Sequence, residues 1–370
     1  MNILYLSATG KIIGGGEVSL FNLLKNLDRN RFNPYLIAPE EGDFTEKVSA
    51  LNIPVIFLSV KKVKNPFNIL HSIENIKHLS HIIKKHKINL VHANVSAGIS
   101  LLCAIAARIR KIPFVWHVRV IYSGHLLDLI LSLLAIKIIL ISEAVKKRFR
   151  WFKKQDKFMV VYNGVDLQKF NPTVDKMHFR QKIGCAEDEF LVGSVGRYHP
   201  FKSYEYFVRA ASMVLKEWPK AKFLIVGLNC SQDNKYLQYL RNLAGQLEIE
   251  DRVIFMEEQH NIPDVFAALD VFVLTSLEEP FGRVLIEAMA SGKPVVAFKG
   301  GAVSEIIENE KTGFVVSAKD TAAMAEKIIY LLQNKDIAKT FGHRGRIRAE
   351  ELFSIKTHTV KIEEIYQGIR

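Results

Sequence analysis

The sequence has few cysteines and no long uninterrupted apolar run. Its three cysteines, Cys103, Cys185 and Cys230, lie far apart in no Cys-x-x-Cys or Cys/His pattern, which argues against a disulfide scaffold and a zinc site. The longest apolar stretch, 126–141, contains two charged residues and is shorter than the roughly 20 residues of a membrane-spanning helix. The N-terminus also lacks the basic region of a secretory signal, so we expect a cytoplasmic protein.

Acidic residues are scarce in the first part of the chain only. Residues 1–170 carry 25 lysines and arginines against 11 aspartates and glutamates, whereas the remaining residues carry 26 against 27. A positive field confined to one part of a protein favours an anionic partner, such as a phosphate-bearing substrate, a membrane surface or a nucleic acid. The alternative interpretation is that the charge serves solubility alone.

Short apolar runs alternate with segments of helical period along the whole chain, which predicts parallel βαβ units in an α/β fold. The length of 370 residues suits two such domains. Asn163-Gly164 and Asn171-Pro172 are the strongest turn signals between them. We therefore predict two doubly wound, Rossmann-like domains, 1–170 and 171–352, followed by a C-terminal segment, 353–370, that contains a helix. The expected strands are 2–8, 33–38, 54–59, 89–93, 113–117, 137–141 and 158–162, then 190–195, 222–226, 252–255, 271–274, 294–297 and 313–316.

Ligands of open parallel sheets bind beyond the carboxyl ends of the strands, and two such domains that face each other would enclose a cleft there. The first loop of this kind carries Gly14, Gly15 and Gly16 directly before a predicted helix, where free backbone N–H groups attract a phosphate. Its spacing does not satisfy the dinucleotide pattern G-x-G-x-x-G, because Ser19 stands at the position of the last glycine. A tight turn without a ligand is the alternative.

Two histidines, His92 and His117, stand where predicted strands end, and either could donate a hydrogen bond to a substrate. A single histidine is more often structural than catalytic, and His117 is the stronger candidate of the two. In the second domain, Arg197 and Lys202 follow a strand and a glycine just before a helix. An arginine fork beside a lysine point charge suits a diphosphate.

Two glutamates eight positions apart, Glu279 and Glu287, flank the start of another predicted helix. Eight helical residues span about 12 Å, which exceeds the roughly 5–9.5 Å between the paired carboxylates of a glycosidase. We therefore expect the pair to hold two ends of one elongated ligand. The backbone N–H groups at this helix start are expected to meet hydroxyls or phosphate, and they belong to Phe281, Gly282, Arg283, Val284 and Leu285.

Basic runs with neighbouring aromatic residues supply the charge of the first domain. They occur at 61–64, at 84–87 and, most strongly, at 146–154. Such a cluster can attract acidic headgroups and bury aromatic edges, which favours an anionic membrane surface and a membrane-linked acceptor. A solvated helix end without a partner is the alternative interpretation. The residues expected at this surface are Lys146, Lys147, Arg148, Arg150 and Trp151.

Taken together, these motifs resemble the retaining GT-B glycosyltransferases of family 4, also called glycosyl transferases group 1. The resemblance runs nearly end to end, and the Glu-x7-Glu pair with Gly196, Arg197 and Lys202 is its most specific part. The family signatures also include the glycine loop with Glu17, Ser142-Glu143 and the segment Asn163-Gly164-Val165-Asp166.

The resemblance implies a role for each candidate residue. Arg197 and Lys202 would hold the donor diphosphate, and Glu287 would bind the ribose hydroxyls. Glu279 would contact the donor sugar together with the backbone of the helix start, and His117 would lie near that sugar. The family generally needs no divalent metal, because positive side chains replace it. The catalytic residues expected are thus Glu279, His117, Arg197 and Lys202.

The expected function is transfer of a sugar from a UDP- or GDP-sugar to a glycan or lipid-linked acceptor in cell-surface polysaccharide or glycolipid synthesis. We expect the first domain to bind the acceptor, the second to bind the donor, and the enzyme to lie peripherally on the inner face of the membrane. The resemblance also implies that the C-terminal helix of segment 353–370 crosses back onto the first domain. The alternatives are a GT-B sugar-nucleotide epimerase and a basic membrane- or nucleic-acid-binding protein without catalysis. No nucleic-acid-binding motif supports the latter.

Overall fold

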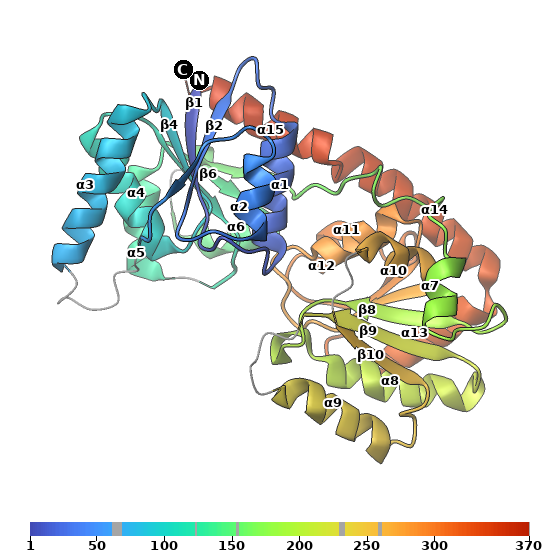
Figure 1. Cartoon of the computed structure of the whole chain (residues 1–370). Helices are drawn as coiled ribbons and strands as arrows, with labels where there is room; N and C mark the ends of the chain where they lie inside the picture. Colours follow the sequence, from blue (N-terminus) through green and yellow to red (C-terminus); the bar gives the residue numbers. More distant parts are fainter. Residues whose placement is uncertain (61–68, 123, 153–154, 229–233, 258–260, 370) are drawn as a thin grey trace. The chain divides into compact units, whose positions relative to one another are not determined.

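The computed structural model describes residues 1–60, 69–122, 124–152, 155–228, 234–257 and 261–369 (Figure 1). The chain forms two compact units, Met1–Gly164 with Ile355–Arg370, and Val165–Ser354. The basic run at 61–64, the end of the basic cluster at 153–154 and Cys230 lie outside the described residues. Among the described residues, no helix is both long and apolar enough to cross a membrane.

The first unit is built on a seven-stranded parallel sheet of order β3-β2-β1-β4-β5-β6-β7. Its strands are β1 Asn2–Leu6, β2 Asn33–Ala38, β3 Val55–Phe57, β4 Leu90–Ala93, β5 Phe114–Val118, β6 Lys137–Leu140 and β7 Phe158–Val160. Its helical segments are α1 Gly15–Asn26, α2 Asp43–Ser49, α3 Ile69–Lys85, α4 Ala97–Ile109, α5 His125–Leu134, α6 Glu143–Lys146, η2 Lys147–Phe149, η3 Gln155–Lys157 and α15 Ile355–Gln367.

The central strands of this sheet are buried on both faces because helices cover both sides. Helices α3, α4 and α5 pack in sequence as one layer, while α2 and α15 pack against α1 in the other (Figure 1). Tyr5, Val115 and Ile139 of the sheet join one core cluster with Ile362 and Tyr366 of α15. The C-terminal helix is thus part of the core of the first unit.

The second unit has a six-stranded parallel sheet of order β10-β9-β8-β11-β12-β13. Its strands are β8 Leu191–Val195, β9 Lys222–Gly227, β10 Val253–Glu257, β11 Val271–Leu274, β12 Val295–Phe298 and β13 Gly313–Val316. Its helical segments are α7 Met177–Lys182, η4 Pro200–Lys202, α8 Tyr204–Glu217, α9 Lys235–Gln246, α10 Ile262–Ala268, α11 Arg283–Ala290, α12 Val303–Ile306, α13 Thr321–Gln333 and α14 Lys335–Leu352. Buried Phe207, Ala211 and Val214 of α8, at helical spacing, pack in the same cluster as Phe223 of β9.

The boundary between the units differs from the expected positions 170 and 353. The structure divides the chain after Gly164 and after Ser354, where Val165 pairs with Ser354 in a parallel β-bridge. Residues 165–170 belong to the second unit because Phe170 packs edge-to-face on Phe266, and Arg346 donates a hydrogen bond to the Phe170 carbonyl at 2.7 Å. Neither contact has a local sequence signal.

Candidate functional site

The loop after β8 begins with a turn that only glycine fits. Gly196 has a φ of 155°, and a Cβ there would lie 2.9 Å from the Tyr204 hydroxyl. That hydroxyl donates a hydrogen bond to the Gly196 carbonyl at 2.8 Å. Arg197 follows, and its side chain is exposed, with no hydrogen bond or ion pair to any residue that the structure describes. Its guanidinium is therefore available to an anion.

Lys202 and Glu279 come together although they are 77 positions apart. Lys202 ends η4, and its carbonyl accepts a hydrogen bond from Thr275 Oγ1, just after β11, at 2.9 Å. Its Nζ donates to Glu279 Oε2 at 2.8 Å, and both side chains are only 12% exposed. Two predicted site residues thus form a shielded ion pair at the carboxyl ends of β8 and β11.

The loop after β12 holds the backbone of Glu279, a contribution that the sequence analysis missed. The Ala302 N–H donates to the Glu279 carbonyl at 2.9 Å. Gly301 has a φ of 53°, and a Cβ there would lie 2.0 Å from the same carbonyl oxygen. The Gly300-Gly301 pair directly after a predicted strand was the available signal.

The second glutamate of the motif pairs with its own cation. Helix α11 begins at Arg283 after Gly282, whose φ of 93° requires glycine. Arg283 Nη2 donates to Glu287 Oε1 at 2.8 Å, one helical turn away. Burial raises the pKa of Glu287, and the positive charges of Arg283 and Lys169 oppose that rise. Among the described residues, Glu279 and Glu287 pair with different cations and not with each other.

The other residues predicted at this helix start differ in burial. The Phe281 ring is buried edge-to-face against Phe353, and the Leu285 side chain is fully buried. Val284 is partly exposed. The Leu285 N–H donates to the Gly282 carbonyl at 2.9 Å, and the N-terminus of a helix favours an oxygen-rich ligand.

In the first unit, the glycine loop leads into α1, which begins at Gly15 with Gly14 as N-cap in an extended conformation. A Cβ at Gly16 would meet no atom within 4 Å, and one at Gly14 would meet only the Glu17 carboxylate at 3.7 Å. Neither glycine has a positive φ. The fold therefore does not itself require glycine at 14 or 16, whereas the close approach of a ligand would.

The two strand-end histidines lie together, but only one of them has a ring nitrogen without a partner among the described residues. His92 is fully buried, and both of its ring nitrogens are engaged, with the Tyr366 hydroxyl at 2.5 Å and with His117 Nδ1 at 3.1 Å. His117 Nε2 is buried and has no hydrogen-bond partner among the described residues. Burial, together with the positive charge of Arg119, lowers the pKa of His92 to about 3 and that of His117 well below its ordinary value.

A second feature absent from the sequence analysis is a junction at Asn163. The Asn163 Oδ1 atom accepts hydrogen bonds from Ser19 of α1 at 2.9 Å and from Arg119, just after β5, at 3.0 Å. The predicted Asn163-Gly164 turn thus connects the glycine-loop helix to the segment that follows His117. The Asn163 side chain therefore links these two segments by hydrogen bonds.

The basic cluster of the first unit is divided by burial. Arg148 is buried and ion-paired with the fully buried Asp128 of α5, so it does not belong to the expected surface. Its Nε donates to Asp128 at 2.8 Å. Lys147, Arg150 and Trp151 are exposed, and Lys146 is half-exposed beside Glu143. Four of the five side chains predicted at this surface are therefore at least partly exposed, and that of Arg148 is not one of them.

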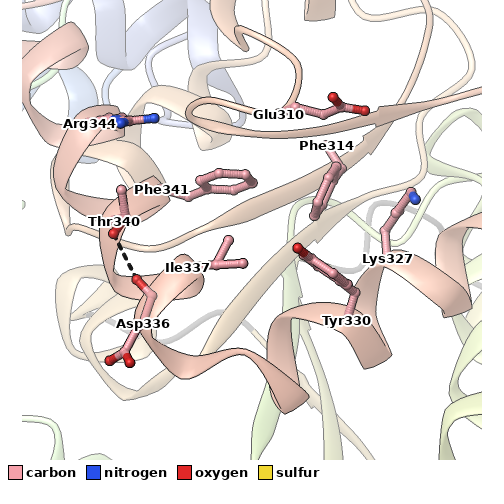
Figure 2. A pocket seen from close by; sticks show the side chains of 9 residues that line it. All are labelled: Glu310, Phe314, Lys327, Tyr330, Asp336, Ile337, Thr340, Phe341 and Arg344. Carbon is pink, nitrogen blue, oxygen red and sulfur yellow. Dashed lines mark hydrogen bonds between the residues drawn. The ribbon is translucent and has the colours of Figure 1, made fainter.

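A separate pocket of about 580 Å³ lies beside edge strand β13 in the second unit. Figure 2 shows Phe314, Tyr330 and Phe341 around it, with Lys327 and Arg344 at its margins. None of the residues predicted for the donor or the acceptor lines it. Among the described residues, no group of three or more His, Cys, Asp or Glu side chains is arranged to hold a metal ion.

Two family models match the chain, one in each unit. Residues 13–169 match Glycosyltransferase Family 4, and residues 175–348 match Glycosyl transferases group 1. The chain is a family 4 glycosyltransferase. The glycosyltransferase assignment favours sugar transfer over the epimerase and the non-catalytic alternatives.

Relatives and solved structures agree with this assignment and with the GT-B fold. The Escherichia coli "UDP-Gal:alpha-D-GlcNAc-diphosphoundecaprenol alpha-1,3-galactosyltransferase" is 26% identical over 95% of this glycosyltransferase and 93% of its own length. A lipopolysaccharide core mannosyltransferase of Rhizobium meliloti is 29% identical, over 57% of this chain and 60% of its own length. The crystal structure of Anabaena HepE in complex with UDP is 27% identical and matches with a TM-score of 0.87 over 100% of both chains.

Proposed function

We propose that this glycosyltransferase moves a sugar, with retention of anomeric configuration, from a nucleoside-diphosphate sugar to a glycan or lipid-linked acceptor. The observation that carries the proposal is the shielded Lys202–Glu279 pair, with the exposed Arg197 guanidinium, unpaired among the described residues, in the same segment after β8. It combines two cations for a diphosphate with a carboxylate for sugar hydroxyls at the ends of neighbouring parallel strands.

Each side chain of the second unit then has a chemical task. Arg197 and Lys202 offset the negative charge that develops on the departing nucleoside diphosphate, in the place of a metal ion. The buried Glu287 accepts hydrogen bonds from two ribose hydroxyls, and Arg283 opposes the rise of its pKa that burial causes. Glu279 orients the transferred sugar. In the first unit, the open space at Gly16 supports a close approach of the donor phosphate.

The transfer step breaks the bond between the anomeric carbon and the phosphate oxygen and forms one to the acceptor oxygen on the same face. The electron pair of the broken bond leaves with the diphosphate, and the acceptor proton passes to a phosphate oxygen of that leaving group. No enzyme nucleophile is needed, so no covalent glycosyl-enzyme forms. Proton NMR of the product would show the donor's anomeric configuration, whereas a trapped adduct would overturn this mechanism.

The comparisons favour a uridine nucleotide and a lipid-linked acceptor. Anabaena HepE is described in complex with UDP, and the Escherichia coli relative is named for UDP-Gal and a diphosphoundecaprenol acceptor. We therefore propose a UDP-sugar donor, with GDP-sugars as the competing class. Transfer to a polyprenyl-diphosphate sugar from UDP-sugars, and none from GDP-sugars, is the expected result.

Helix α5 supports membrane docking of the first unit. Leu126, Leu129 and Leu133, at helical spacing, are all exposed, the first and last by 70% and 65%. The buried Arg148–Asp128 pair ties this helix to the basic turn that bears Lys147 and Arg150. An exposed apolar helix face beside cations matches an anionic lipid surface.

Vesicle sedimentation tests this docking surface. The protein should bind vesicles with about 30% phosphatidylglycerol and not neutral ones. Leu126→Asn with Leu133→Asn, and separately Lys147→Glu with Arg150→Glu, should each abolish binding. Ile347→Asn, which removes a 40% exposed apolar residue in the second unit, is the control. Equal vesicle binding by all variants would refute the proposal that this surface docks on the membrane.

Sugar transfer itself is tested by activity with and without a chelator. The proposal predicts full activity after EDTA treatment, because the cations of the site are side chains. It also predicts that Glu279→Gln and Arg197→Ala lose transfer while keeping the fold. Activity that depends on an added divalent ion would overturn the metal-free part of the proposal.

A further inference from the structure

A chain of four buried rings runs from the C-terminal helix to the unpaired nitrogen of His117. The Tyr5 hydroxyl of β1 lies 2.9 Å from the Tyr366 hydroxyl of α15, which lies 2.5 Å from His92 Nδ1 of β4. His92 Nε2 lies 3.1 Å from His117 Nδ1 of β5. All four side chains are at most 1% exposed. The strands β1, β4 and β5 are neighbours in the sheet, so the four-ring chain crosses it from one strand to the next.

The Tyr5 end of this four-ring chain fixes the direction of its hydrogen bonds. Among the described residues, the Tyr366 hydroxyl is the only hydrogen-bond partner of the Tyr5 hydroxyl. A fully buried hydroxyl proton needs an acceptor, so Tyr5 donates to Tyr366. The single proton of Tyr366 is then directed at His92 Nδ1. The opposite direction would leave the Tyr5 proton buried without an acceptor.

The hydrogen-bond direction continues through the two imidazoles, because a neutral ring has one donor and one acceptor nitrogen. Burial and the charge of Arg119 keep both rings neutral, with lowered pKa values. His92 accepts at Nδ1 and must therefore donate from Nε2 to His117 Nδ1. His117 then carries its own proton on Nε2, the buried atom without a partner among the described residues.

We propose that Tyr366 of α15, acting through His92, holds His117 in the Nε2–H tautomer, so that His117 donates a hydrogen bond to an oxygen of the sugar substrate. Tyr366 and His92 are positioning residues, and His117 is the residue that touches substrate. In this state His117 cannot accept a proton at Nε2 and does not act as a general base. The inference rests on the proposed function only in giving His117 a sugar ligand.

The tautomer can be read in the unmodified protein. In nitrogen NMR of full-length protein labelled at its 12 histidines, His117 Nε2 should show a pyrrole-type shift and Nδ1 a pyridine-type shift. A His117→Gln spectrum identifies the signals. The reverse pattern, with the proton on Nδ1, would overturn the proposed direction. This measurement needs no substrate and no assumption about activity.

Two conservative variants distinguish the proposed hydrogen-bond direction from a mere packing role of the hydroxyls, since each variant removes one hydroxyl from the same hydrogen bond. Tyr5→Phe leaves Tyr366 free to donate to His92, so the tautomer and kcat should stay within about twofold of the native values. Tyr366→Phe removes that donor, so His117 should become a mixture of tautomers and kcat should fall at least about tenfold with little change in KM. Equal losses in both variants would show that the hydroxyls serve packing alone and would overturn the inference.

His117→Ala distinguishes this inference from the proposed function. Loss of transfer in His117→Ala, with the Nε2–H signal present in native protein, supports both. Unchanged transfer in His117→Ala would remove His117 from the reaction and overturn the role inferred for its proton. A failure of all transfer in native protein, with the tautomer as expected, would instead count against the proposed function.

Discussion

Replacing Gly16 with alanine should make the protein more stable and less active. Gly16 is the second residue of α1, has no positive φ, and has open space where a Cβ would stand. Alanine in a helix is favoured over glycine by about 0.5–1 kcal/mol, and a domain of this size gains about 2–4 °C in Tm per kcal/mol. We therefore expect a Tm increase of roughly 1–4 °C.

The activity should move in the opposite direction, because the added methyl group occupies the space that the donor phosphate is proposed to enter. A loss of at least tenfold in kcat/KM corresponds to about 1.4 kcal/mol of lost transition-state binding. Gly98 is the matched control, since it is the second residue of α4 and a Cβ there would also meet no atom within 4 Å. Gly98→Ala should share the stabilisation and keep full activity. Native kinetics for Gly16→Ala would refute the proposed approach of the ligand.

Three further predictions concern the second unit. Glu287→Gln should raise Tm at neutral pH and have little effect at low pH, as melting curves across pH would show. Burial raises the folded-state pKa of Glu287. The contribution of Glu287 to stability is therefore most favourable below its unfolded-state pKa and is lost as pH rises through the folded-state pKa. Charge swapping Lys202→Glu with Glu279→Lys should recover the stability that either single change loses but not the activity, which should stay about 100-fold below native in a transfer assay. Gly342→Ala should destabilise the second unit by about 1–3 kcal/mol in urea unfolding, because its Cβ would lie 2.1 Å from a backbone carbonyl oxygen. Gly345→Ala should be tolerated, because its Cβ would lie 3.4 Å from a methionine side chain.

Strands were predictable from the sequence because parallel strands covered on both faces are continuous short apolar runs. The run Val271–Leu274, for example, is a strand with the predicted bounds. Helix α14, Lys335–Leu352, was not predicted, because Gly342 and Gly345 and many charged residues weaken its helical pattern. The close approach of Gly342 to a neighbouring backbone explains that glycine, and no local pattern reveals such an approach.

The candidate site was predictable where its residues are close in sequence. Glu279 and Glu287 stand at a fixed spacing around one helix start, so the motif identifies both. The partners that set the state of a side chain are distant in sequence: Arg148 pairs with Asp128 20 positions away, and Tyr366 meets His92 across 274 positions. Burial and tertiary contact decided these roles, and neither is encoded in a local spacing.

Thermal stabilisation by UDP, with GDP and ADP for comparison, tests whether the second unit holds a nucleotide-sugar donor. A ligand at 100 times its dissociation constant adds about 2.7 kcal/mol of stability. The account predicts that UDP stabilises the native protein and that Arg197→Ala and Glu287→Ala each remove the effect. Stabilisation by no nucleoside diphosphate, or stabilisation that persists in both variants, would contradict the assignment of the donor site to the second unit.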